Sequence, residues 1–195
     1  KSTGVAFGVS AARNVIGTSG TAVRATVSGT PVRSTGAVGV RAESKADIDA
    51  TTVTVAVGVS GSGSGDSLSA SLGGSGARNT INVATTAELF AADGTSIAVE
   101  AGSLAVTAKN TSTISADVGE ASVAGSFGQG KSVAVSLTAS VAINEISGNV
   151  AATVKNADVT TLAGGVTIEA TRQGTIEPRA AAASVAVSAS ADKSI

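Results

Sequence analysis

Three short stretches of the chain carry nearly the same five residues around an asparagine. Residues 12–16 read Ala-Arg-Asn-Val-Ile, residues 77–81 read Ala-Arg-Asn-Thr-Ile, and residues 142–146 read Ala-Ile-Asn-Glu-Ile. The three asparagines are evenly spaced, with a period of about 65 residues. A fixed period of this kind indicates a repeat architecture, in which each unit is one structural element of a stack. We expect a single block of three repeats, which run over about residues 1–65, 66–130 and 131–195.

A second stretch recurs in the same three units and shows which positions are preserved. It runs over residues 36–48, 102–114 and 164–176. Its apolar positions stay apolar while the positions between them change freely, and the apolar ones are spaced by two residues, which is the period of a β-strand. We expect the preserved columns to face inward and the variable columns to face water. The preserved columns are Val38/Leu104/Val166, Val40/Val106/Ile168, Ala42/Ala108/Ala170 and Ile48/Ile114/Ile176.

Alternation of Val or Thr with small residues continues through most of the chain. It is clear in residues 52–59, 133–137 and 184–188, whereas no window sustains apolar residues at i, i+3 and i+4. Valine, isoleucine and threonine suit a pleated surface that is buried on one side. The sequence therefore predicts an all-β protein.

Stacked repeats with matched columns predict a parallel β-solenoid (β-helix). Adjacent coils would lie about 4.8 Å apart, and Asn14, Asn79 and Asn144 would form one hydrogen-bonded file at a turn. Each repeat could hold three small rungs of about 21 residues or one wide flat coil. A sub-period near 21 is absent, which favours the wide coil. Its two long arms would run over about residues 36–60 and 67–92, joined by Gly-rich tips at 60–65, 125–131 and 164–165.

The composition limits both the interior and the chemistry. Aromatic residues make up 2% of the chain, and it has no Cys, Met, Trp, Tyr or His. The interior must therefore be built from Ala, Val and Gly, and disulfide, thiol and imidazole chemistry are excluded. The formal charge is −1, from 13 Lys and Arg against 14 Asp and Glu. With no excess of positive charge and few aromatic residues for base stacking, nucleic-acid binding is not expected.

Several polar patterns have the outline of a site, and none is expected to be one. Residues 61–69 resemble one degenerate copy of a nonapeptide calcium repeat around Asp66, but the equivalent tips carry Gln129 and Lys131, so we interpret the stretch as a flexible tip. Asp47 and Asp49 lie on one strand face, and the pair does not recur in the other units. We expect no catalytic residues, no cofactor, no metal and no enzymatic activity.

The chain carries no recognisable secretory signal and no long apolar run. We interpret it as an internal or mature block of a longer protein, and expect no membrane insertion of this segment.

Three phrases of the sequence resemble a known family. They are Ser-Val-Ala-Ile-Asn-Glu-Ile at 140–146, Asn-Ala-Asp-Val-Thr-Thr at 156–161 and Gly-Gly-Val-Thr-Ile-Glu-Ala at 164–170. They are similar to repeats of large bacterial filamentous adhesins and exoproteins of the filamentous-haemagglutinin-like and leukotoxin type. The resemblance implies a structural fibre or stalk segment at the bacterial cell surface or outside the cell, acting in adhesion, cell aggregation or matrix and biofilm formation.

The open terminal coils of such a solenoid predict self-association or continuation end to end along its axis. The alternative is a carbohydrate- or receptor-binding module, which would contact a glycan or host surface through the Gly-rich tips. With few aromatic residues, these tips would make poor platforms for a sugar ring.

Overall fold

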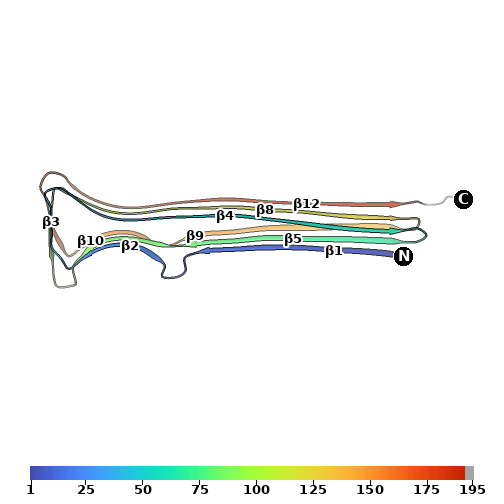
Figure 1. The fold of residues 1–195 in the computed structure, drawn as a ribbon, viewed down its shortest axis with the longest axis horizontal. Coiled ribbons are helices and arrows are strands. Elements are labelled where there is room, and N and C mark those ends of the chain that lie inside the picture. The colour runs from blue at the N-terminus through green and yellow to red at the C-terminus, as the bar shows by residue number, and fades with distance from the viewer. Residues whose placement is uncertain (192–195) are drawn as a thin grey trace.

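The protein folds into long parallel strands, one set above the other, as the computed structural model shows for residues 1–191 (Figure 1). The prediction of an all-β protein is confirmed for these residues, which contain strands, turns and bends and no helix. Consequently, no helix in this part of the chain could cross a membrane. The strands are β1 (Ser2–Ile16), β2 (Ala22–Ser28), β3 (Val32–Arg33), β4 (Ala37–Ser62), β5 (Ser67–Asn82), β6 (Ala84–Phe90), β7 (Ile97–Ala101), β8 (Ser103–Gly128), β9 (Ser132–Ser147), β10 (Val150–Lys155), β11 (Ala157–Thr161) and β12 (Val166–Ser190).

The strands form four sheets of three strands each, with the orders β1-β5-β9, β2-β6-β10, β3-β7-β11 and β4-β8-β12. All pairings are parallel, and each sheet takes one strand from each third of the chain. Ser2 pairs with Ser67 and Ser67 pairs with Ser132, so each strand lies beside its equivalent in the next unit. Between β4 and β8 the step is one residue longer, as in the pair Ala37 and Ser103.

The asparagine file predicted from the sequence is present. Asn14 pairs with Asn79, and Asn79 pairs with Asn144. Asn14 Nδ2 donates to Asn79 Oδ1 at 2.8 Å, and Asn79 Nδ2 donates to Asn144 Oδ1 at 2.8 Å. The file lies inside β1, β5 and β9 rather than at a turn, so the predicted placement at a turn was wrong. Inside a strand the backbone ladder fixes the spacing between neighbouring asparagines, so their side-chain amides are held at hydrogen-bonding distance.

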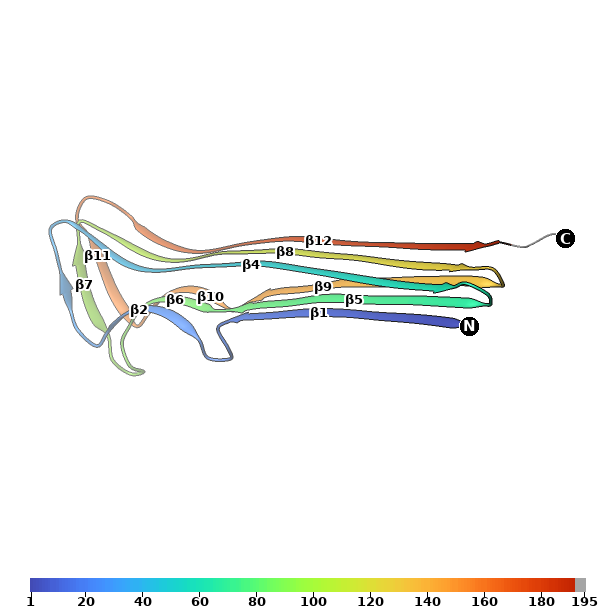
Figure 2. The ribbon, with the colours of Figure 1, turned by 45° about the vertical axis from the view of Figure 1, so that its right-hand side comes forward.

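Two long layers and a rounded end make up the molecule. In Figures 1 and 2 the layer β1-β5-β9 runs beside the layer β4-β8-β12. The shorter strands β2, β3 and their partners connect the two layers at the end away from the N-terminus, which we call the closed end. The larger apolar side chains gather at this closed end. The cluster there includes Leu89, Val99, Leu104 and Val106, each at most 1% exposed. A second cluster around Ile48, Ile81 and Ile114 lies where the two layers begin to run together.

The preserved apolar columns face inward in the first two units. Val40 and Val106 are buried, whereas their partner Ile168 on β12 is 51% exposed. Strand β12 contacts the other layer mainly through β9 and β10 of its own unit, whereas β4 is covered by both β1 and β5. The inward direction predicted for these columns is thus confirmed for the first two units, and the third unit differs because strands of a single unit cover it.

Candidate functional site

The outer face of β4 is charged near the closed end of the molecule. Its outward residues from 41 to 49 are Arg41, Glu43, Lys45, Asp47 and Asp49, all exposed. Arg41 Nη2 lies 2.6 Å from Glu43 Oε2, and Lys45 Nζ lies 3.6 Å from Asp47 Oδ2. These pairs are open to solvent, so each contributes little to stability.

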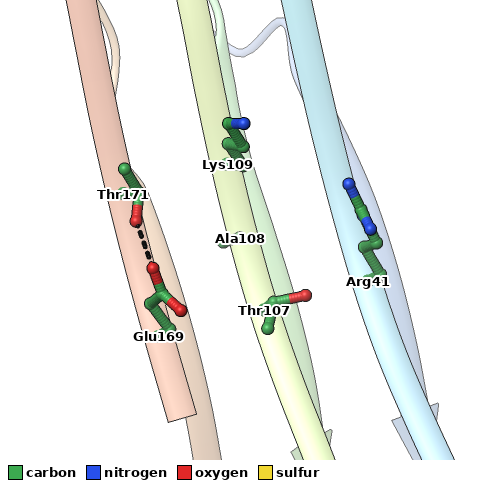
Figure 3. A pocket seen from close by; sticks show the side chains of 6 residues that line it. All are labelled: Arg41, Thr107, Ala108, Lys109, Glu169 and Thr171. Atoms are coloured by element: carbon green, nitrogen blue, oxygen red, sulfur yellow. Dashed lines mark hydrogen bonds between the residues drawn. The ribbon is translucent and has the colours of Figure 1, made fainter.

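A shallow depression crosses this charged face. Figure 3 shows Arg41 on β4, Thr107 and Lys109 on β8, and Glu169 and Thr171 on β12. Thr171 Oγ1 donates to Glu169 Oε1 at 2.8 Å. This pair brings a hydroxyl and a carboxylate together on an open surface, where Glu169 is exposed to solvent and charges of both signs lie side by side.

The outer face changes character at Thr51. Beyond it the outward residues of β4 are Val53, Val55, Val57 and Val59, which are 57–67% exposed. Thr51 pairs in register with Asp117 on β8, and Asp117 pairs with Arg179 on β12. This polar row, with two charged residues, ends the polar region on this face. We call the part of both layers that lies beyond that row, on the side of the Gly-rich tips, the distal arm. It is made up of residues 3–13, 51–61, 68–78, 117–127, 133–143 and 179–189.

The opposite face of the distal arm is apolar as well. Its outward residues include Phe7 on β1, Leu72 on β5 and Leu137 on β9, which are partners in one row and are 75%, 37% and 62% exposed. The apolar stretch ends at Arg13 and Arg78, which also form a row. Apolar outer surfaces of this extent mark interaction sites in soluble proteins.

The inside of the distal arm is polar and closely packed. Ser69 Oγ donates to the carbonyl of Gly58 at 2.8 Å, and Ser71 Oγ donates to the carbonyl of Ala56 at 2.9 Å. A Cβ on Gly58 would lie 2.7 Å from the carbonyl oxygen of Ala70, so the layers approach too closely for a larger residue there. In the distal arm Ala and Gly face inward as predicted and Ser and Thr join them, but Val118 is buried while Val53, Val55, Val57 and Val59 face outward, so the prediction of a largely valine interior is wrong there.

One carboxylate is enclosed between these layers. Glu120 is 6% exposed, and its Oε2 accepts a hydrogen bond from the backbone N–H of Ala139 at 3.0 Å. Its Oε1 is buried without a hydrogen-bond partner among the described residues. The space for it comes from Gly73, where a Cβ would lie 1.8 Å from Oε1. A buried carboxylate with one unpaired oxygen costs stability.

We therefore expect Glu120→Gln to leave the free energy of unfolding within about 1 kcal/mol of the parent, because the amide oxygen keeps the bond from Ala139 while the unpaired carboxylate oxygen becomes an NH2 group without an acceptor. Gly73→Ala should destabilise the protein while Glu120 is present and have little effect in a Glu120→Ala background. Urea unfolding of the single and double variants measures this coupling. Equal effects of Gly73→Ala in both backgrounds would show that Glu120 does not determine the need for glycine.

Asp66 lies at the exposed tip and has a structural partner. Its Oδ1 accepts a hydrogen bond from the backbone N–H of Lys131 at 3.0 Å, and Gly130 passes so close that a Cβ there would lie 2.7 Å from the same oxygen. Within residues 1–191 no three Asp or Glu side chains are grouped to hold a metal ion. The structure thus uses Asp66 to link the tips of two neighbouring units.

A second polar link lies at the corner before β11. Asn156 adopts a left-handed backbone conformation with φ of 52°, and its Nδ2 donates to the carbonyl of Ala91 at 3.2 Å. Lys155 Nζ lies 2.8 Å from Asp93 Oδ1. The hydrogen bond and positive charge of Lys155 lower the pKa of the Asp93 carboxyl. Both contacts join neighbouring units, as the asparagine file does.

The apolar outer faces were not predicted from the sequence, although a signal for them was present. On β4, odd-numbered residues carry the charges from 41 to 49 and the valines from 53 to 59. A strand keeps its odd-numbered side chains on one face, so the valines had to face the same way as the charges.

Comparison with protein-family models, with curated proteins and with solved structures gives no match.

Proposed function

We propose that this chain is a structural segment of an extracellular bacterial fibre or stalk, which acts in adhesion, cell aggregation or matrix formation. In this proposal the chain is a parallel β-solenoid, and each repeat of about 65 residues makes one wide flat coil. Strand partners that lie one whole repeat apart, such as Val32 with Val99 and Ala157 with Ile97, support the wide coil over three small rungs.

The observation that carries the proposal is the pair of open sheet edges. Strands β1 and β4 lie at one edge of their sheets, and β9 and β12 lie at the other. Strand β4 is 26 residues long and β12 is 25, so each edge exposes a long row of unpaired backbone groups. Such edges pair readily with a further strand. Further coils or copies would continue the same ladders and extend the stack along its axis.

A direct fusion of two copies of the chain tests this axial continuation. We expect the stacked dimension of the fusion to grow by about 14 Å, since each of the three added coils adds about 4.8 Å. Small-angle X-ray scattering and cryo-electron microscopy measure the growth. Aligned assemblies should give a meridional reflection near about 4.8 Å.

A proline variant provides the control. The N–H of Ser2 donates to the carbonyl of Asp66, so in a parallel ladder the N–H groups of odd-numbered residues on β1 point to the free edge. Val5→Pro in the second copy should therefore block its junction without breaking a ladder bond inside the block. Two blocks that move as separate particles in the unmodified fusion would contradict the proposal. Binding of the single block to a glycan array, with no axial growth, would favour the tip-binding alternative.

A further inference from the structure

The β1-β5-β9 face of the distal arm changes sharply in side-chain size from one row to the next. Phe7, Leu72 and Leu137 form a row of large side chains, and the next outward row is Val9, Gly74 and Ala139. A Cβ at Gly74 would meet nothing within 4 Å. The glycine is not required by the chain's own packing, and it leaves a trough beside a ridge.

We propose that two copies of the chain pack arm against arm through this face, with their arms antiparallel. A twofold axis along the stacking direction, between the two rows, sets the leucines of the ridge over the small residues of the other copy's trough on β5 and β9, and sets Phe7 over Val9 at the β1 edge. Leu72 then lies over Gly74 of the second copy, and Leu137 lies over its Ala139. This lateral contact does not depend on the axial stacking proposed above.

The same twofold axis pairs charges at the two ends of the face. It sets Lys131, at the tip, opposite Glu145 of the second copy. It also brings Asp66 next to the row that contains Arg78 of the second copy. Lys131, Asp66 and Glu145 are all exposed. Complementary charges at the rim of an apolar contact favour one orientation of the partners.

The area of the face is adequate for a pair of copies. Outward residues on a sheet occupy about 32 Å² each, so the rows from Thr3 to Arg13 across three strands cover about 600 Å² on each copy. A pair would bury about 1,200 Å², at the lower end of the range for specific interfaces. Packed sheets of this kind lie about 10 Å apart.

A lipid bilayer fits the arm less well than a second copy. In hydrocarbon the unpaired backbone groups of the four edge strands β1, β4, β9 and β12 would have no partner, and each such group is costly there. In an arm-to-arm pair these edges stay in water. The arm also lacks the Trp and Tyr residues that anchor proteins at membrane interfaces.

The opposite face of the arm does not have the same self-complementary shape. Its outward residues on β4 are valines at 53, 55, 57 and 59. An antiparallel pair through that face would set valine against valine along β4, and on the middle strand β8 the ring of Phe127 covers Gly125, where a Cβ would lie 3.3 Å from it. Gly119 lies on β8, the middle strand of the β4-β8-β12 face, just as Gly74 lies on β5, the middle strand of the β1-β5-β9 face. A Cβ at Gly119 would make only ordinary contacts, the nearest at 3.9 Å.

Gly74→Val tests the proposal, with Gly119→Val as the matched control. Sedimentation equilibrium should show a reversible dimer of the 195-residue chain. We expect Gly74→Val to raise the dissociation constant about 30-fold or more, because it fills the trough twice in each dimer. Gly119→Val should change it less than about twofold. Circular dichroism should show the same β-content for both variants and the parent.

A charge exchange tests the orientation of the two arms. Lys131→Glu should weaken the dimer several-fold, and adding Glu145→Lys should restore it. A chain that stays monomeric into the millimolar range would overturn the proposal, as would a dimer that Gly74→Val leaves unchanged. Flotation of the monomeric chain with phosphatidylcholine vesicles would overturn it by assigning the face to lipid. A dimer lost only with Val5→Pro would overturn it by assigning the association to the sheet edges.

Discussion

Replacing Asn79 with aspartate will lower the free energy of unfolding by about 3 kcal/mol or more at neutral pH. Asn79 is 0% exposed, accepts a hydrogen bond from Asn14 and donates one to Asn144. Aspartate keeps the acceptor but has no N–H for the oxygen of Asn144. If the Asn144 amide rotated, its N–H could donate to the new aspartate at position 79. The negative charge of that aspartate would still be buried with no cation beside it.

The matched control is Asn144→Asp in the same file. Asn144 accepts its bond from Asn79 and lies on β9 at the edge of the sheet, where it is half-buried. Aspartate can accept the same bond there, and water reaches it, so we expect a loss below about 1 kcal/mol. Urea unfolding at neutral pH compares the two variants. Equal losses would mean that burial within the file does not set the cost of a charge.

Ile114→Ala will lower the free energy of unfolding by about 3 kcal/mol, because it opens a cavity in the middle of a packed cluster. Ile114 is 0% exposed and belongs to the cluster with Ile48, Ile81 and Val83. Alanine occupies many positions in these strands, so the loss reports packing rather than strand propensity.

Ile176→Ala provides the control for that cavity. Ile176 is the register partner of Ile114 on β12 and is 42% exposed. Its truncation should cost below about 1 kcal/mol, since water already reaches the side chain. Thermal or urea unfolding measures both variants. If Ile176→Ala cost as much as Ile114→Ala, the third unit would have to be covered by another part of the protein.

The register of the sheets was predictable from the sequence. The asparagine file and the columns around Val40 and Ile48 predicted the pairing of neighbouring units, because stacked strands place equivalent residues side by side. The first predicted long arm corresponds to β4, whereas the second, over about 67–92, runs past the end of β5 into β6 at the closed end. The Gly-rich tips at 60–65 and 125–131 lead from one long strand into the next. The third predicted tip, at 164–165, lies instead between β11 and β12 at the closed end.

The direction of the side chains in the distal arm does not follow from the alternation alone, and predicting it requires following the odd-numbered charged residues 41–49 along the same strand. Alternation of Val with Ser, Thr or Gly has the same period whichever set faces inward. Val53 to Val59 suggested an apolar interior, whereas the close approach of the two layers admits only small residues between them. The inward Ser69 and Ser71 then bond to backbone carbonyls across the layers.

The closed end was also not predicted, since two short strands per unit leave little pattern. Strand β3 has two residues and β7 has five. They turn the chain between the layers and enclose Leu89 and Leu104, which supply much of the large apolar volume of the core.

The central claim is that residues one repeat apart lie side by side on neighbouring parallel strands, and engineered cysteines test it most directly. The chain has no cysteine of its own. Lys45 pairs with Thr111, while Ser115 lies two outward positions further along β8 and pairs with Asp49. A disulfide needs Cα atoms about 4.4–6.8 Å apart, which neighbouring strands provide and a shift of four residues does not.

We predict that Lys45→Cys with Thr111→Cys forms a disulfide under mild oxidation and that Lys45→Cys with Ser115→Cys does not. Non-reducing electrophoresis and mass spectrometry of the oxidised monomers follow both pairs over time. Equal or faster crosslinking of the second pair would contradict the stacked register.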